Sequence, residues 1–465
     1  MSTFDTNLIM RTDSYKISHW RQYPAGTEKI YSYFESRGGR FDSTLMFGLN
    51  YYLKEYLSRP ITMQDIDEAE KRFQAHFGRN IFNRRGWERI VQMHNGFLPV
   101  EIRAVPEGTL VPNSNVLLTV VNTDPELPWV TNYVETVLAK LWYPITVATT
   151  SFEIKRLIKS YLERTGDPAG LNFKLHDFGA RGVSSEESAV IGGMAHLINF
   201  MGTDTIVAFE GAKAFYGEGM AGFSVPAAEH STITSWGRHN ETEAYRNMIR
   251  QFGDQGIYAV VSDSYDIYNA CENLWGGVLK QEVLGAPATL VVRPDSGIPH
   301  EVVLKVTQLL GQRFGFVLND KGFKVLNKVR VIQGDGIEYE SIKQILDSLT
   351  NHGWSADNIT FGMGGALLQK MDRDTNRFAF KCSATKIDGV WVDVWKDPVT
   401  DQKKASKRGR LALVETNEGM MTVPRWSSNG AFVEEDNLLQ VVWKNGEQLV
   451  DPTFSEIRER VDKQL

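Results

Sequence analysis

Cysteine is scarce in this sequence: its 465 residues include two cysteines, Cys271 and Cys382, and no CxxC pair. A disulfide framework and a thiolate zinc site are therefore disfavoured, and a reducing compartment is expected. No apolar stretch approaches the ~20 residues that span a bilayer. The N-terminus also lacks a basic segment followed by an apolar run. We therefore expect a soluble cytoplasmic protein without a membrane partner.

Familiar catalytic fingerprints are missing as well. There is no Walker A pattern, HExxH pair, GxSxG elbow or complete GxGxxG motif, so P-loop, zincin, hydrolase and Rossmann interpretations lose their main support. Charge is nearly balanced, with 51 Lys and Arg against 57 Asp and Glu. That balance argues against nucleic acid as a partner. Hydrophobic residues make up 42% of the chain, as in globular proteins, and its length predicts two domains or one large barrel with additions.

The sequence contains two kinds of segment that differ in their hydrophobic pattern. Short runs of alternating apolar and polar residues, separated by turn signals such as EG, NEG and KNG, lie at 97–124, 390–398, 410–425 and 438–450. Such runs are typical of antiparallel strands. We expect a β-rich α+β domain built from both chain ends, residues 1–144 and 384–465.

The middle of the chain repeats a different unit. An apolar run ends in a polar or glycine cluster, and a helix-like stretch follows, mostly at intervals of about 30 to 40 residues, as in a strand with its crossover helix. The runs lie at 173–182, 204–211, 258–266, 288–297, 329–336 and 358–365. This pattern predicts an α/β fold, an irregular β/α barrel over 145–383. Its chemistry is expected at the carboxyl ends of the strands.

Each cluster at a strand end has more than one interpretation. The lone His230 in VPAAEHSTI is a packed core residue, a metal ligand or a reactive group, and the stretch alone leaves all three open. Asp263 and Asp266 bind a hydroxyl or Mg²⁺ through water, or cap a helix. Gly364 and Gly365 hold a phosphate at a helix start, or simply close a turn.

A local positive charge narrows these choices. Arg293 offers a planar fork for phosphate, with a surface salt bridge as the alternative. Basic residues follow the glycine-rich strand ends: Arg373, Lys381, Lys396, Lys403, Lys404, Lys407 and Arg408. A charge run is usually a solvated face, but this pairing suggests a polyanionic small molecule such as a sugar phosphate or diphosphate. The residues by themselves predict a barrel enzyme that acts on a phosphorylated sugar.

Ten strings, in order along nearly the whole chain, carry a resemblance to a known family. They are TDSYK (12–16), YSYFESR (31–37), WYPITVAT (142–149), KLHDFGARGVSS (174–185), GTDT (202–205), SVPAAEHSTI (224–233), VVSDSYDIYNAC (260–271), RPDSG (293–297), VIQGDG (331–336) and FGMGGALLQK (361–370). The sequence resembles the nicotinamide phosphoribosyltransferases, within the type II phosphoribosyltransferases. The resemblance implies condensation of nicotinamide with phosphoribosyl pyrophosphate, by a homodimer whose two active sites lie at the subunit interface.

The resemblance also implies roles for residues around the pyridine ring. Phe178 would stack on one face of the ring, and Tyr15 of the partner subunit on the other, because a flat ligand suits an aromatic sandwich. Arg181 would lie beside the carboxamide. Asp204 would accept a hydrogen bond from the amide and repel a nicotinate carboxylate, which favours nicotinamide over nicotinic acid.

For the sugar and phosphates, the resemblance implies a second set of residues. Ribose would be held by Asp295, Asp335 and Gly334 with Arg293 beside them, and the 5′-phosphate by Gly364 and Gly365. Pyrophosphate would be met by Arg373, Lys381, Lys396, Lys404 and Arg37, the last from the partner subunit. Asp263 would lie near Mg²⁺, through water. His230 would be phosphorylated by ATP, with Glu229 as a candidate to orient its ring, and His230, Asp295 and Asp263 would form the catalytic set.

Two departures from the family pattern concern the phosphate region. Ala379 stands where a serine is expected, and the segment after Arg37 is short. Two other functions stay open. One is a nicotinate phosphoribosyltransferase, against which Asp204 and Tyr15 argue. The other is a catalytically retired binding protein on the same scaffold, against which the retained site residues argue.

Overall fold

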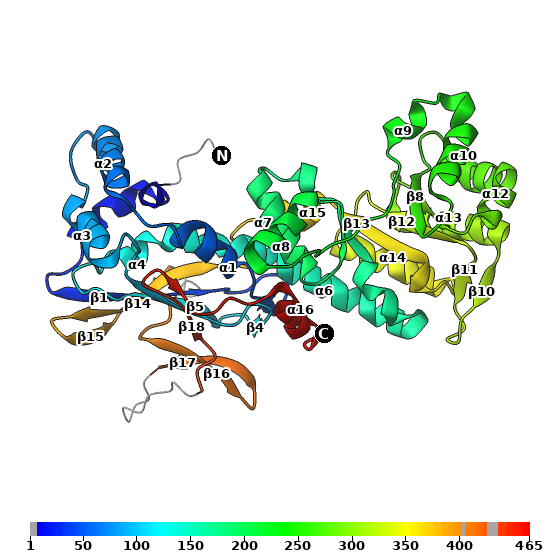
Figure 1. Cartoon of the computed structure of the whole chain (residues 1–465). Coiled ribbons are helices and arrows are strands. Elements are labelled where there is room, and N and C mark those ends of the chain that lie inside the picture. Colours follow the sequence, from blue (N-terminus) through cyan, green and yellow to red (C-terminus); the bar gives the residue numbers. More distant parts are fainter. Residues whose placement is uncertain (1–6, 401–404, 426–435) are drawn as a thin grey trace. The chain divides into compact units, whose positions relative to one another are not determined.

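The computed structural model describes residues 7–400, 405–425 and 436–465. By its contacts the chain divides into two units (Figure 1). The first contains Met1–Thr149, Phe215–Gly217 and Met371–Gln464, and the second contains Thr150–Ala214, Glu218–Lys370 and Leu465. Within the described ranges, no helix combines the length and apolar character needed to cross a membrane.

The first unit is built on an antiparallel sheet of seven strands. Their order is β15 (Val390–Asp393), β14 (Ala379–Ile387), β1 (Thr27–Glu35), β5 (Val116–Asn122), β3 (Val100–Ala104), β18 (Gln440–Lys444) and β19 (Glu447–Gln448). Strands from both chain ends thus share one sheet, as the sequence predicted. Residues 379–383 belong here and not to the barrel, because β14 pairs along its whole length with β1.

Smaller elements complete this unit. Two further antiparallel pairs are β2 (Ser43–Leu45) with β4 (Leu110–Pro112), which are distant in sequence, and the hairpin of β16 (Leu411–Thr416) with β17 (Gly419–Pro424). The helices are α1 (Leu49–Tyr52), α2 (Met63–Phe77), α3 (Arg84–His94), α4 (Val130–Tyr133), α5 (Glu135–Leu138) and α16 (Phe454–Asp462). Helix α2 begins at a capping box formed by Thr62 and Asp65 and ends at Gly78, whose φ of 66° a residue with a Cβ rarely adopts. Helix α6 (Trp142–Thr165) runs through the boundary between the units.

The second unit contains a parallel sheet of six strands. Their order is β7 (Gly202–Thr203), β6 (Leu175–Asp177), β13 (Ile359–Met363), β12 (Val329–Gln333), β9 (Thr289–Arg293) and β8 (Ile257–Val261). The helices are α7 (Glu186–Leu197), α8 (Ile206–Tyr216), α9 (His230–Thr234), α10 (Glu241–Phe252), α11 (Ile267–Asn269), α12 (Lys280–Gly285), α13 (Pro299–Phe314), α14 (Tyr339–Asn351) and α15 (Gly365–Leu368). A hairpin of β10 (Phe316–Leu318) and β11 (Lys324–Leu326) follows α13.

An extended segment, 223–228, connects the two edge strands of this sheet. On one side Phe223 donates its N–H to the carbonyl of Met201 at 2.7 Å and accepts from Thr203 at 3.0 Å. On the other side the N–H of Ala228 donates to the carbonyl of Ala259 at 2.9 Å, and a parallel bridge joins Ala227 to Ala259. The sheet therefore closes into an irregular β/α barrel, as predicted.

Apolar side chains from three neighbouring strands fill part of this barrel. Ala259, Val291 and Ile332 are each less than 9% exposed, and Phe178 and Val225 pack against them. Fully burying a valine or isoleucine side chain stabilises the fold by about 1.5–3 kcal/mol. Phe178 and the closing segment, through Val225, are thus fixed by the barrel's own core.

One predicted strand is wrong. Residues 204–211 were expected to form a strand, but the strand is limited to Gly202–Thr203 and a helix, α8, begins at Ile206. Ala208 and Ala212, four residues apart, are fully buried, which is the helical spacing. A short apolar run cannot be distinguished from a buried helix by its periodicity.

Candidate active site

Most of the candidate residues in the second unit lie at one edge of the barrel. Phe178, Asp204 and Asp263 follow β6, β7 and β8 within two residues, and Arg293 is the last residue of β9. Gly334 and Asp335 follow β12 directly, and Gly364 follows β13. Because these strands are parallel and adjacent, their carboxyl ends meet at this edge. The structure therefore brings this set together at one edge of the sheet, and the roles expected of these residues stay predictions.

Phe178 lies against two glycines at this edge. Its backbone N–H donates to the carbonyl of Met363 at 3.0 Å. A Cβ atom on Gly362 would lie 1.9 Å from the Phe178 ring, and one on Gly334 would lie 3.4 Å from it. The guanidinium of Arg293 is 5.7 Å from the ring centroid. The ring thus has a defined seat that only glycine at 362 permits.

Asp204 lies next to this turn. Its backbone N–H donates to the carbonyl of Asp177 at 2.9 Å, and its carboxylate oxygen Oδ1 accepts a hydrogen bond from the hydroxyl of Ser224 at 2.6 Å. Ser224 belongs to the segment that closes the barrel. Buried Asp177 accepts from the N–H of Gly179 at 2.7 Å, and burial raises the pKa of its carboxyl to about 6. Asp204 is itself exposed, so its second oxygen is available to a ligand.

His230 begins helix α9, and its side chain is 47% exposed, which excludes a packed core histidine. Its Nε2 lies 2.8 Å from Oδ1 of Asp263, whose side chain is 5% exposed. Oδ2 of Asp263 accepts from the hydroxyl of Ser296 at 2.6 Å. A carboxylate held on both oxygens fixes the orientation of the imidazole and leaves Nδ1 free of this bond.

The structure answers two other questions about these residues. The side chain of Glu229 accepts from the hydroxyl of Ser231, so the observed partner of the imidazole is Asp263. Asp266 accepts from the N–H groups of Tyr268 and Asn269 and caps α11, which is the structural interpretation that the sequence left open.

The ribose candidates also come together. Arg293 donates two hydrogen bonds to Oδ1 of Asp295, from Nε at 3.2 Å and from Nη2 at 3.0 Å. A Cβ on Gly334 would lie 3.6 Å from both the Arg293 Nε and the Asp295 Oδ1. Nothing lies within 4 Å of the Cβ position of Gly365, and that of Gly364 faces the carbonyl of Phe178 at 3.5 Å. Backbone at these glycines is accessible to a ligand that approaches closely.

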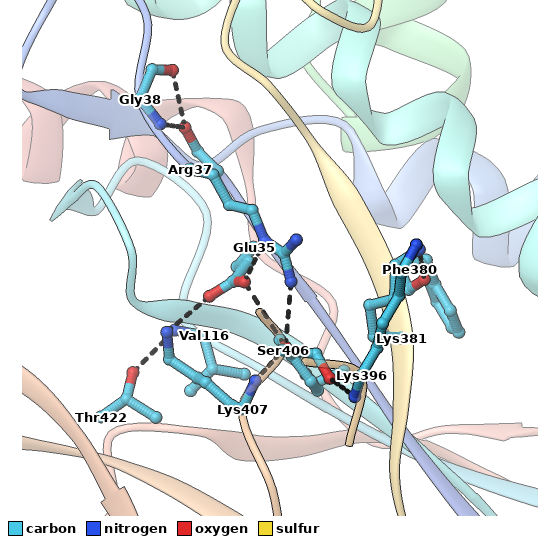
Figure 2. Close-up of polar contacts among 12 residues, drawn as sticks. Glu35, Arg37, Gly38, Val116, Phe380, Lys381, Lys396, Ser406, Lys407 and Thr422 are labelled. Carbon is cyan, nitrogen blue, oxygen red and sulfur yellow. Dashed lines mark hydrogen bonds and ion pairs between the residues drawn. The ribbon is translucent and has the colours of Figure 1, made fainter. Parts of the chain in front are cut away.

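Three other candidate cations, Arg37, Lys381 and Lys396, lie in the first unit near the ends of β1 and β14 (Figure 2). Burial lowers the pKa of Lys381, and the positive charges of Arg37, Arg373 and Lys396 lower it further. Each of these three cations therefore acts electrostatically on Lys381. A group of neighbouring cations attracts a polyanionic ligand.

Three of the predicted site residues, Tyr15, Arg181 and Lys404, are not part of the groups described above. The ring of Tyr15 is 59% exposed and meets the ring of His19 edge to face at 4.9 Å. Arg181 is exposed on a short helical turn after Phe178. Lys404 lies outside the described residues.

Sequence reasoning missed three residues of these sites. Ser224 and Ser296 stand within quoted motifs, yet a serine gives no signal of which carboxylate it contacts. Glu35 lies two residues before Arg37, and its contact with Lys407, a member of the predicted basic run, was not foreseen. Their contact joins positions 372 residues apart, and no local pattern encodes such a pair.

Comparison with known proteins identifies the family. A model of the nicotinate phosphoribosyltransferase (NAPRTase) family matches residues 173–446, and one of the nicotinamide phosphoribosyltransferase N-terminal domain matches residues 7–102. The chain belongs to the nicotinate phosphoribosyltransferase family. A nicotinamide phosphoribosyltransferase of Xanthomonas campestris pv. campestris is 52% identical over 98% of both chains. One of Acinetobacter baylyi is 34% identical over 100% of this chain and 98% of its own.

Solved structures support the same fold. A nicotinate-nucleotide pyrophosphorylase from Pyrococcus furiosus aligns over 100% of this chain and 98% of its own, with a TM-score of 0.64 at 18% identity. Human nicotinic acid phosphoribosyltransferase aligns over 97% and 93%, with a TM-score of 0.58 at 16% identity. At these identities the likeness concerns the fold, which agrees with the barrel and the β-rich unit described above.

Proposed function

We propose that the protein is a nicotinamide phosphoribosyltransferase, which transfers the phosphoribosyl group of phosphoribosyl pyrophosphate to nicotinamide and releases pyrophosphate in NAD salvage. The observation that carries this proposal is Asp204, a carboxylate beside the Phe178 turn with one oxygen bound to Ser224 and the other available. Such a group accepts a hydrogen bond from an amide NH₂ and repels a carboxylate. The names of the two relatives above point to the same substrate.

In this proposal the second unit binds both the pyridine and the sugar. Phe178 stacks on the pyridine ring and Arg181 lies beside its carboxamide, so that the ring nitrogen is directed to the ribose. Asp295, Asp335 and the backbone at Gly334 hold the ribose hydroxyls, with Arg293 fixing Asp295. Gly364 and Gly365 receive the 5′-phosphate. Carboxylates near C1 stabilise the positive character that develops there as pyrophosphate leaves.

His230 couples the reaction to ATP in this proposal. Its imidazole is exposed at the barrel edge and held through Nε2 by Asp263, so Nδ1 is the nitrogen offered to a phosphoryl group. Neutral imidazole is nucleophilic near pH 7. Asp263, fixed by Ser296, stabilises the positive charge on the ring.

Mg²⁺ is the metal that this chemistry calls for. Mg²⁺ is usually held by substrate phosphates and waters with one or two carboxylates, and in this proposal Asp263 would contribute through water. When bound, the ion would neutralise charge on the leaving pyrophosphate.

The first unit contributes the remaining groups, and we propose that it does so across a homodimer. Tyr15, with its ring exposed, stacks on the free face of the pyridine of the partner's site. Arg37 of the same subunit meets the pyrophosphate there, with Arg373, Lys381, Lys396 and Lys404. A cytoplasmic location belongs to this proposal, and the two free cysteines agree with it.

The test is nucleotide formation by the purified protein with phosphoribosyl pyrophosphate and Mg²⁺. Nicotinamide and nicotinic acid are compared side by side, each with and without ATP. The proposal expects product from nicotinamide only, increased by ATP. Product from nicotinic acid would instead favour a nicotinate phosphoribosyltransferase, the activity for which the family model is named. Absence of product from both would favour a non-catalytic binding protein.

A further inference from the structure

Glu35 is a buried carboxylate at the end of β1, inside the cation cluster of the first unit (Figure 2). Its side chain is 3% exposed, and each of its oxygens faces a different cation. Nε of Arg37 lies 2.6 Å from Oε1, and Nζ of Lys407 lies 2.6 Å from Oε2. The two cations are more accessible, at 15% and 25% exposure. The anion thus lies beneath two cations that reach toward the surface.

The surrounding contacts fix this arrangement. The hydroxyl of Tyr33 accepts from Nη2 of Arg37 at 3.3 Å and from the backbone N–H of Lys407 at 2.8 Å. Across the sheet Ala379 is the direct neighbour of Glu35, and Lys381 is the neighbour of Tyr33. Ala379 offers no polar group, so the carboxylate is held by the two cations and by the hydroxyl of Tyr33, which donates to Oε1 at 3.4 Å. Glu35 and Lys381 therefore share one face of the sheet.

Both cations keep donors for a second anion. Arginine has five N–H donors and lysine three, and Glu35 engages Nε of Arg37 and one direction of the Lys407 ammonium. We propose that Glu35 is a positioning residue, which holds Arg37 and Lys407 as a paired contact for one end of a polyphosphate ligand. Lys407 thereby becomes a phosphate-binding residue. This inference rests on the proposed function for the identity of the ligand, pyrophosphate or its phosphoribosyl ester.

The direction in which pyrophosphate affinity changes distinguishes a positioning role of Glu35 from a purely electrostatic one. Glu35→Gln removes one negative charge from the cluster, so long-range attraction alone predicts tighter pyrophosphate binding. Positioning predicts the opposite, because the amide NH₂ of glutamine repels one cation and both lose their orientation. We expect pyrophosphate to bind about tenfold more weakly to this variant, as for loss of one charge-assisted contact.

The chain offers a matched control. Glu101, on β3 of the same sheet, also bridges an arginine two residues later, Arg103 at 3.0 Å, and a lysine from a distant strand, Lys444 at 3.2 Å. Glu101→Gln therefore removes a comparable bridge and the same charge. It is expected to leave pyrophosphate affinity and the KM for phosphoribosyl pyrophosphate unchanged.

The experiment measures pyrophosphate binding by calorimetry in the presence of Mg²⁺, together with the KM for each substrate and the unfolding temperature. The inference expects weaker pyrophosphate binding and a raised KM for phosphoribosyl pyrophosphate in Glu35→Gln, with the KM for nicotinamide unchanged. Equal or tighter binding in Glu35→Gln would overturn it.

If Glu35→Gln does not fold, a second variant tests whether Lys407 binds phosphate. Lys407→Met keeps the length of the side chain and the Glu35–Arg37 pair, and the same loss of binding is expected. Unchanged binding in Lys407→Met would overturn the role of Lys407. A wild-type protein that binds pyrophosphate but forms no nucleotide would overturn the proposed function, while the binding comparison would still decide this inference.

Discussion

Gly362 decides where the Phe178 ring can lie, and replacing it with alanine is a direct test of the proposed pyridine site. The new Cβ would lie 1.9 Å from Cε2 and 2.2 Å from Cδ2 of Phe178. Ordinary carbon contacts begin near 3.5 Å, so the ring must move by about 1.5 Å. The backbone of Phe178 is held by its bond to Met363, and the displacement therefore falls on the ring. A shift of this size removes most of the stacking with a bound pyridine.

Loss of stacking costs about 1 kcal/mol, and misplacement of a reacting ring by ~1 Å reduces the rate by up to ~10²-fold. We expect Gly362→Ala to lower kcat/KM for nicotinamide by about 10- to 100-fold, measured by varying nicotinamide at saturating phosphoribosyl pyrophosphate. Gly285→Ala is the control, because nothing lies within 4 Å of its Cβ position. In a Phe178→Ala background, Gly362→Ala should add little, because the two act on one contact. Wild-type kcat/KM in Gly362→Ala, or full additivity with Phe178→Ala, would refute the reasoning.

Three further predictions concern carboxylates. Asp263→Asn leaves His230 without its anionic partner and should reduce ATP hydrolysis during turnover by about 10²-fold; undiminished hydrolysis would contradict this role. Ser224→Ala frees the Asp204 carboxylate to rotate, so the preference for nicotinamide over nicotinic acid should fall about tenfold, and a competition assay that finds the same ratio counts against it. Burial raises the pKa of Glu107 from 4.5 to about 7, so stability present below pH 4.5 is lost as the pH rises through 7. Glu107→Gln should therefore raise stability by about 3 kcal/mol at pH 8.5 and little at pH 5, whereas equal shifts in melting temperature at both pH values would argue against a charge effect.

The sequence predicted the barrel and the gathering of polar clusters at one edge, because parallel strands bring their carboxyl ends to the same side. Asp263, Arg293 and Gly334 each follow or end an apolar run, and these positions alone were enough to group them. The strand expected at 204–211 failed because its short apolar run, 206–209, cannot be distinguished by periodicity from the start of helix α8. The segment 223–228 carried no strand signal, since its proline and alanines are not typical of strands.

Side-chain contacts between positions far apart in the sequence could not be predicted. The partner of His230 was sought in its neighbour Glu229, but a side chain at the start of a helix points toward whatever the tertiary fold places there, and β8 places Asp263 there. Glu35 and Lys407 meet only because the sheet of the first unit combines both ends of the chain. Such contacts depend on strand register and on which strands pair, and local composition determines neither.

The extended segment 223–228 closes the barrel by hydrogen-bonding to both edge strands of the parallel sheet. It carries Ser224, which holds Asp204, and leads within two residues to His230. Asp204 and His230 thus both depend on this segment, which is fastened on each side by a few backbone hydrogen bonds rather than by a full ladder. A shift of the segment displaces both side chains together. Under the proposed function, in which Asp204 selects the pyridine and His230 takes the phosphoryl group of ATP, substitutions in the segment are expected to change pyridine preference and ATP use as a pair.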